Sequence, residues 1–157
     1  MDVADRVVLI TGASSGVGAA LATQLAEMGA RVVVNYSRSA EAAEAVVEQI
    51  TGAGGQALAV QADVSEEGDC KQLVAKTVEQ FGQLDVLVNN AGTATFVPHD
   101  QLDALTEDIW LRTLRVNLIG AFMMSREAAP HIEAAGGGEI VMTSSIASMT
   151  ANGSSIA

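Results

Sequence analysis

A glycine-rich turn near the amino terminus is the first feature whose residues could bind a ligand. The stretch TGASSGVG, residues 11–18, follows the apolar run Val7–Ile10 and precedes a helical pattern. Glycine allows close approach of the backbone to a ligand, and a helix amino terminus offers free N–H groups at the positive end of its dipole. The arrangement predicts a site for the pyrophosphate of a dinucleotide, although a glycine turn that binds nothing has the same composition. The residues expected at this site are Gly12, Ser14, Ser15, Gly16, Val17 and Gly18.

The segment after the second apolar run bears on which dinucleotide would bind. NAD-binding proteins usually place Asp or Glu there for the ribose 2′-hydroxyl, whereas an arginine suits a 2′-phosphate. Residues 35–39 read NYSRS, and the first acid after them is Glu41. Ser37 and Arg38 therefore favour NADP(H) over NAD(H). The alternative is that Arg38 is a solvated surface residue.

Polar residues also follow the third and fourth apolar runs. Asp63 and Val64 come after the third run, and Asn89-Asn90-Ala91-Gly92 comes after the fourth. Because ligands of parallel sheets bind outside the carboxyl ends of the strands, these residues are expected beside the glycine turn. Each group also has a structural interpretation. DVSEE is a good helix start that Asp63 would cap, and the asparagines would tie strand ends together.

Two further positions could take part in chemistry. Asn117 lies inside a helical pattern, where asparagine is unfavourable by propensity, and this indicates a specific role. Ser144 and Ser145 follow the fifth apolar run, where a hydroxyl either positions a substrate or only ends the strand. The histidines and the single cysteine lie far apart in the sequence, so no metal site is predicted.

The scaffold that must position these residues is predicted by the alternation of apolar runs and helical patterns. The runs are rich in β-branched residues and do not alternate with polar ones, as in strands buried on both faces of a parallel sheet. In the first helical pattern Val17, Leu21, Leu25 and Met28 recur every three or four residues. The order predicts an α/β fold with a doubly wound parallel, Rossmann-like sheet, in one dinucleotide-binding domain over residues 1–157. Strands are expected at 7–10, 32–34, 58–60, 86–88 and 140–142, and helices at 17–28, 39–51, 65–81 and 106–135.

Composition excludes several classes of partner. The chain has 157 residues, with 19 acidic against eight basic side chains and a formal net charge of −11. Such a chain is a poor binder of nucleic acid or anionic membranes, and it has no apolar run long enough for a membrane helix. The single cysteine, Cys70, cannot form an internal disulfide, and the first residues do not read as a signal peptide. A cytoplasmic location is expected.

The motifs together resemble the short-chain dehydrogenase/reductase family. The resemblance rests on the spacing TGxxxGxG, on NNAG at residues 89–92, and on the positions of Asp63, Asn117 and Ser145. The beta-ketoacyl-carrier-protein reductases and glucose-dehydrogenase-like members look most similar. The resemblance implies hydride transfer between NADP(H) and a small carbonyl or alcohol substrate, in a homo-oligomer. It also implies that Asp63 and Val64 contact adenine, that Asn90, Ala91 and Gly92 line the cofactor site, that Ser145 positions the substrate oxygen, and that Asn117 supports a proton-relay water.

The family's proton donor is a tyrosine in a Tyr-x-x-x-Lys motif, which would come shortly after Ser145 and beyond Ala157. The only tyrosine here is Tyr36, and the only lysines are Lys71 and Lys76. The resemblance therefore implies an amino-terminal portion that lacks its last strands and helices, with an exposed fifth strand and an inactive site. The alternative is a non-catalytic, nucleotide-binding Rossmann protein that acts as a sensor or subunit partner.

Overall fold

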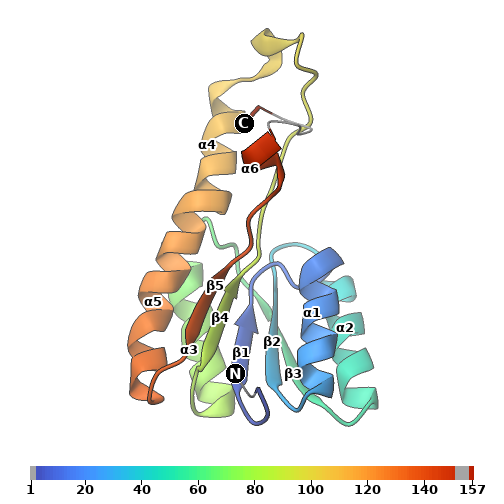
Figure 1. The fold of residues 1–157 in the computed structure, drawn as a ribbon, viewed down its shortest axis with the longest axis vertical. Coiled ribbons are helices and arrows are strands. Elements are labelled where there is room, and N and C mark those ends of the chain that lie inside the picture. Colours follow the sequence, from blue (N-terminus) through green and yellow to red (C-terminus); the bar gives the residue numbers. More distant parts are fainter. Residues whose placement is uncertain (1–2, 151–155) are drawn as a thin grey trace.

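A five-stranded parallel sheet forms the centre of the molecule. The computed structural model describes residues 3–150 and 156–157 (Figure 1). The strand order is β3-β2-β1-β4-β5, and every pairing is parallel. This confirms the predicted doubly wound sheet. The strands are β1 (Val7–Ile10), β2 (Arg31–Tyr36), β3 (Gln56–Gln61), β4 (Val86–Asn89) and β5 (Glu139–Met142).

Helices cover both faces of the sheet, and alternate residues of β1 show how. Val8 and Ile10 belong to the core under the helices α1 (Gly16–Glu27) and α2 (Ala40–Gly52). Val7 and Leu9 belong to a second core, on the opposite face of the sheet. The helices on that face are α3 (Glu67–Phe81) and a long rod, which consists of α4 (Glu107–Leu114), a π-helical segment η2 (Arg115–Gly120) and α5 (Ala121–Ala134). Two short elements, η1 (Leu102–Ala104) and α6 (Ala147–Thr150), complete the described part.

The buried face of α1 differs in part from the one that its large apolar residues indicate. Val17 and Met28 are 69% and 59% exposed, whereas Gly18, Ala22 and Ala26 are buried. The fully buried residues of α1 are thus small, while Leu21 and Leu25 are partly buried against the same core. Small residues let the helix lie close to the sheet and the glycine turn, which a stripe of leucines would prevent.

The rod formed by α4, η2 and α5 replaces the single regular helix expected at 106–135. The helical turn widens at η2, where Gly120 lies against the loop that follows β3. A Cβ atom on Gly120 would lie 2.8 Å from the carbonyl oxygen of Val64. The close approach therefore needs glycine, and the π-helical turn accommodates it.

The fifth strand is exposed, as the family resemblance implied, and it is not buried on both faces as its apolar run alone indicates. It pairs only with β4, at the edge of the sheet, and all four of its residues are exposed. On the neighbouring rod, Leu118 and Phe122 are also more than 60% exposed. An edge strand has a partner on one side only, so periodicity alone could not distinguish it from the central strands.

The start of β4 is held by a buried carboxylate, Asp85, which is 1% exposed. Its Oδ1 accepts a hydrogen bond from Arg6 at 2.9 Å, and its Oδ2 accepts from the Val7 N–H and from Gln83, both at 2.7 Å. Burial acts to raise the pKa of Asp85, but the hydrogen bonds from Val7, Gln83 and Arg6 outweigh it and hold the pKa below its ordinary value. The carboxylate thus joins the starts of β1 and β4.

Acid is expected to remove this contribution to stability. A carboxylate whose pKa is lowered by folding stabilises the protein above its unfolded pKa of about 4, and that stabilisation disappears as the pH falls through the lower folded value. Asp85→Asn should lower the free energy of unfolding by about 1–3 kcal/mol at neutral pH and should flatten its decline in acid. Urea unfolding at neutral pH and at about pH 3 measures both effects.

The matched control for this prediction is Asp100→Asn, because Asp100 is an exposed acid in the loop after β4. That variant should keep both the stability and the acid profile of the parent chain. An Asp85→Asn variant that shows the parent's full decline in acid would contradict the assignment.

Candidate functional site

A cleft of about 270 Å³ opens at the carboxyl ends of the strands. Ligand sites of open parallel sheets occur at this edge, where the direction of strand order changes. Here the reversal lies between β1 and β4. The cleft is lined by Gly12, Ser14, Ser15, Asn35, Tyr36, Ser37, Arg38, Ser39, Ala62, Asp63, Val64, Asn90, Ala91, Gly92, Thr93, Arg112 and Val116.

Most of the residues expected to bind a dinucleotide line this cleft, and three do not. The three are Gly16, Val17 and Gly18, which lie at the beginning of α1. Gly16 and Val17 are exposed there, while Gly18 is buried behind the turn. Their contribution is therefore to the shape of the turn and the start of the helix. The direct cofactor contacts expected of them stay predictions.

The glycines of the turn are required by its geometry. Gly12 and Gly16 have φ of +63° and +57°, a region that side chains disfavour. A Cβ on Gly12 would lie 2.8 Å from the Cα of Ala91, and a Cβ on Gly18 would lie 2.7 Å from the carbonyl oxygen of Gly12. The glycine turn is thus packed tightly against the loop that follows β4. Its backbone lies directly before the amino-terminal end of α1.

Asn35 holds the glycine turn in place through hydrogen bonds, a role that no sequence motif predicted. Its side chain is buried, its Oδ1 accepts a hydrogen bond from the Gly12 N–H at 3.2 Å, and its carbonyl oxygen accepts from the Ala13 N–H at 2.8 Å. Its Nδ2 donates to the carbonyl oxygens of Val60 and Ala62. Asn35 therefore joins the turn to β2 and β3. The available signal was a polar residue at the end of the otherwise apolar run Val32–Val34.

Thr11 and Asn90 fasten the turn to β4. The hydroxyl of Thr11 accepts hydrogen bonds from the N–H groups of Asn90 and Ala91 at 2.9 and 3.0 Å. The Nδ2 of Asn90 donates to the carbonyl oxygens of Thr11 and Gly12. This geometry agrees with the structural interpretation of Asn90, that of tying strand ends together, and its amide nitrogen is already occupied by the turn.

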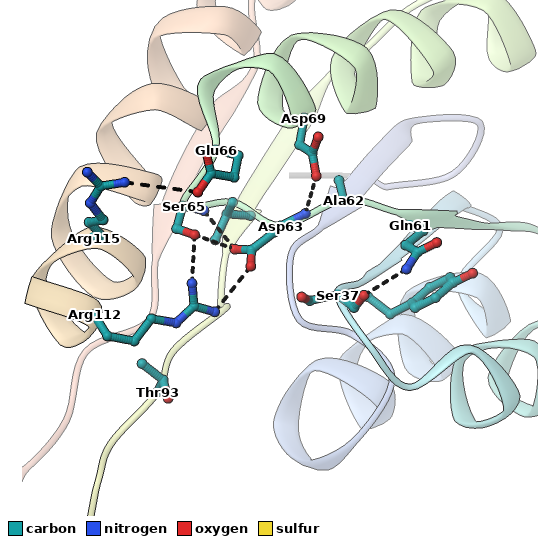
Figure 2. A network of polar contacts seen from close by, with 12 residues as sticks. Ser37, Gln61, Ala62, Asp63, Ser65, Glu66, Asp69, Thr93, Arg112 and Arg115 are labelled. Carbon is teal, nitrogen blue, oxygen red and sulfur yellow. Dashed lines mark hydrogen bonds and ion pairs between the residues drawn. The ribbon is translucent and has the colours of Figure 1, made fainter. Parts of the chain in front are cut away.

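The end of β2 brings a cation to the cleft. Arg38 is exposed, and within residues 3–150 and 156–157 it has no ion-pair partner. The preceding backbone is held in place, because Gln61 of β3 donates from Nε2 to the carbonyl oxygen of Ser37 at 3.0 Å (Figure 2). The Arg38 guanidinium is therefore available to an anionic ligand at a fixed point of the chain.

Asp63 lies at the end of β3 and takes part in a network with α4 (Figure 2). Its Oδ1 accepts hydrogen bonds from the N–H and hydroxyl of Ser65 at 3.0 and 2.7 Å, and its Oδ2 accepts from Arg112 at 3.2 Å. Burial acts to raise the pKa of Asp63, but the bonds from Ser65 and Arg112 prevail and lower it. Asp63 is not the cap of α3, because that position is Glu66. Its side chain instead holds the turn of residues 63–65 before the helix, and it lines the cleft.

Comparison with known proteins identifies the family. The family model described as short chain dehydrogenase matches residues 6–157. The chain belongs to the short-chain dehydrogenase family.

Individual relatives agree with that assignment. Versicolorin reductase 1 of Aspergillus parasiticus is 47% identical over 140 residues, which are 89% of this chain and 52% of that protein. A short-chain dehydrogenase from Burkholderia cenocepacia J2315 in complex with NADP has a TM-score of 0.87 and 37% identity, over 99% of this chain and 62% of that one. A metagenomic short-chain oxidoreductase in complex with NADP has a TM-score of 0.85 and 35% identity, over 93% and 65%. The chain therefore spans little more than half the length of such relatives.

Asn117 of this chain lies in the π-helical segment η2 and is exposed. Its Oδ1 accepts a hydrogen bond from the Thr93 N–H at 2.8 Å, and its Nδ2 donates to the Thr93 carbonyl oxygen at 2.9 Å. Both ends of the amide thus bind the chain that leaves the NNAG segment. The helical asparagine thus has a defined structural contact, while its part in a proton relay stays a prediction.

Ser145 comes after β5 and is exposed, as is Ser144. The Oγ of Ser145 accepts a hydrogen bond from the Ala147 N–H at 3.2 Å, at the start of α6. Neither serine is among the described residues that line the cleft. The structure therefore leaves the expected pairing of Ser145 with the cofactor site as a prediction.

Two observations bear on other ligand classes. Within the described ranges, no group of three or more His, Cys, Asp or Glu side chains is placed to hold a metal ion. A second hollow of about 370 Å³ lies at the opposite edge of the sheet, where residues such as Ala30, Arg31 and Gln56 begin β2 and β3. That edge carries the amino ends of the strands and is not where parallel sheets bind dinucleotides.

Proposed function

We propose that this chain is the nucleotide-binding part of an NADP(H)-dependent oxidoreductase that transfers hydride between nicotinamide and a small carbonyl or alcohol substrate. The family assignment supports the reaction class, and solved relatives in complex with NADP support a nicotinamide cofactor. The observation that carries the proposal is the glycine turn at the carboxyl end of β1, which packs so tightly that a Cβ atom on Gly12 or Gly18 would collide with neighbouring protein atoms. Titration of the chain with NADPH by calorimetry tests it, and absence of binding would contradict it.

The fit of the chain to a dinucleotide follows from what its residues offer. The pyrophosphate would lie against the turn at residues 12–16 and the first turn of α1, where N–H groups and the helix dipole favour anions. Ser37 and Arg38 would hold a 2′-phosphate, because no carboxylate of β2 competes for that place. When bound, NADP(H) supplies the hydride donor or acceptor. The residues of this chain bind and orient it.

For the substrate, we propose that Ser145 donates a hydrogen bond to the reacting oxygen and that Asn117 supports a water for proton transfer. A phenol has an ordinary pKa of about 10 and needs a nearby cation to work as an acid at neutral pH. The only tyrosine of this chain, Tyr36, ends β2, and its lysines lie on α3. No residue of the chain therefore supplies the tyrosine–lysine pair that the family resemblance implies.

The 157-residue chain is accordingly expected to reduce no carbonyl substrate above background. The reason is that it binds a cofactor but contains no acid placed to protonate the product oxygen. NADPH oxidation followed by absorbance with a panel of ketones and aldehydes measures this. Ser145→Ala serves as the control and should show the same background rate. Turnover by the parent chain that Ser145→Ala lowers would overturn the expectation.

A non-catalytic, nucleotide-binding role as a sensor or subunit partner is the second candidate. It is favoured by the one observation that the turn is complete while the tyrosine–lysine pair is absent from the chain. A fusion of this chain to a carboxyl-terminal segment that supplies the tyrosine–lysine pair distinguishes the two candidate functions. Only the oxidoreductase proposal expects the fusion to reduce a carbonyl substrate.

The remaining properties of the full protein are proposed from the surface and composition. Leu118, Phe122 and Met142 are exposed on the rod and on β5, and we propose that further chain or a second copy covers them in a homo-oligomer. The net charge of −11 argues against nucleic acid as a partner. In the described ranges no helix combines the length and apolar character that crossing a bilayer requires. The single cysteine, Cys70, is buried and forms no disulfide, which fits the proposed cytoplasmic location. We also propose that residues 1–157 form a single dinucleotide-binding domain.

A further inference from the structure

Arg112 of α4 reaches the cleft from the side opposite β2. Its NH1 donates to the Ser65 hydroxyl at 2.7 Å and its NH2 donates to the Oδ2 of Asp63 at 3.2 Å (Figure 2). The two ends of one planar guanidinium thus bind two neighbouring residues of the β3–α3 loop. Arg112 and Asp63 both line the cleft. A planar group with two bonds fixes direction as well as distance, which a lysine ammonium cannot do.

These contacts determine where Asp63 can still accept a hydrogen bond. Its N–H donates to Asp69 at 2.8 Å, which holds the backbone. Its Oδ1 receives two bonds from Ser65, while its Oδ2 receives one bond, from Arg112. Each carboxylate oxygen has two lone pairs, so one acceptor position on Oδ2 remains. The lowered pKa of Asp63 keeps the carboxylate ionised and able to use it.

The cofactor's base would lie next to that acceptor. With the pyrophosphate at the glycine turn and the 2′-phosphate at Ser37 and Arg38, the base is directed past β2 toward the end of β3. Asp63 and Val64 form the cleft wall there. Adenine presents a 6-amino group as a donor, whereas hypoxanthine presents a carbonyl oxygen that a carboxylate would repel.

We propose that Arg112 is a positioning residue, which orients the Oδ2 of Asp63 to accept a hydrogen bond from the 6-amino group of the cofactor's adenine. The inference rests on the proposed function. It extends it by giving α4 a part in base recognition through a residue that no sequence motif indicates. Arg112 acts on the base through Asp63 and not by direct contact.

A neighbouring pair provides the matched control. Arg115 lies one turn further along the rod, with its NH1 4.0 Å from the Oε1 of Glu66 (Figure 2). Arg115 does not line the cleft. Arg115→Met therefore removes the same charge from the same rod without touching Asp63. It controls for general electrostatics and for any weakening of the rod.

The test compares adenosine 2′,5′-bisphosphate with inosine 2′,5′-bisphosphate on the 157-residue chain, by calorimetry at constant ionic strength. Both probes carry the same phosphates, so the ratio of their dissociation constants isolates the base. The parent chain should prefer adenine by about tenfold, the size of one hydrogen bond to a charged group. Arg112→Met should bring the ratio close to one, Arg112→Lys should restore part of it, and Arg115→Met should keep it.

Every other outcome contradicts either the role of Arg112 or the proposed function. If Arg112→Met keeps the parent's base preference, or if the parent has none, the role of Arg112 is wrong while the proposed function stands. If the parent binds neither probe, the proposed function is wrong and the role of Arg112 with it. If circular dichroism shows that Arg112→Met does not fold, Arg112→Gln replaces it, because that change removes the charged guanidinium that donates to the Oδ2 of Asp63. An unchanged ratio in Arg112→Gln would then reject the role.

Discussion

Replacing Arg38 with aspartate is expected to invert the nucleotide preference, so that NADH binds more tightly than NADPH. Arg38 is exposed at the end of β2, beside the backbone that Gln61 holds. A guanidinium bound to a 2′-phosphate contributes charge-assisted hydrogen bonds of about 1.5–3 kcal/mol. Aspartate removes these bonds, repels the phosphate and accepts from a free ribose hydroxyl. The ratio of the two dissociation constants should therefore change by about 100-fold or more, as measured by calorimetry.

Arg115→Asp is the control for this experiment, since it makes the same change of charge on the rod outside the cleft. That variant should weaken both nucleotides slightly and equally. Equal affinities for NADPH and NADH, both before and after Arg38→Asp, would reject the role of Arg38.

A methyl group on Gly18 is expected to weaken binding of any dinucleotide by about 10- to 100-fold. The added Cβ would lie 2.6 Å from the Nδ2 of Asn90, 2.7 Å from the Gly12 carbonyl oxygen and 2.9 Å from the Cα of Ala13. Two of these atoms are backbone, so the turn itself must move. Overpacking of this kind costs about 1–3 kcal/mol, and here it displaces the groups that face the pyrophosphate. Calorimetric titration of Gly18→Ala with NADPH and NADH measures the loss, which should be equal for both.

Gly68→Ala is the matched control for Gly18→Ala. Gly68 lies in α3, and a Cβ there would meet no heavy atom within 4 Å. That variant should keep the parent's affinity and gain slightly in helix stability. Full binding by Gly18→Ala would show that the turn relaxes without loss, and the tight packing of the turn would then not explain recognition.

The sheet could be predicted from the sequence because its signals are local. Each apolar run, such as Val7–Ile10, reports its own burial, and alternation with helical patterns leaves few topologies. The residues around the cleft were predictable where a motif marks them, as for Gly12 and Arg38. Asn35 and Arg112 were missed because their partners are distant in sequence: Asn35 binds Gly12 and Arg112 binds Asp63. Such pairs exist only once the strands and the rod are assembled.

The burial of residues in α1 could be predicted only in part. Of the four residues whose spacing predicted this helix, Leu21 and Leu25 pack against the core, whereas Val17 and Met28 are exposed. The structure buries small residues at that contact, where close approach to the turn matters more than apolar area. The same limit applies to β5, whose residues resemble a central strand although it has only one neighbour.

The π-helical segment η2 lets the two halves of the rod, α4 and α5, take different orientations about the helix axis. In a regular α-helix each residue advances by about 100°, so the orientation of α4 would dictate that of α5. The wider turn at η2 uses more residues per turn and resets this relation. Arg112 of α4 can therefore face the cleft while Met124 and Ala128 of α5 pack in the core under α3, and Val116 of η2 takes part in both surfaces. The half of the rod that reaches the cleft can in this way take an orientation about the helix axis that the core packing of the other half does not dictate.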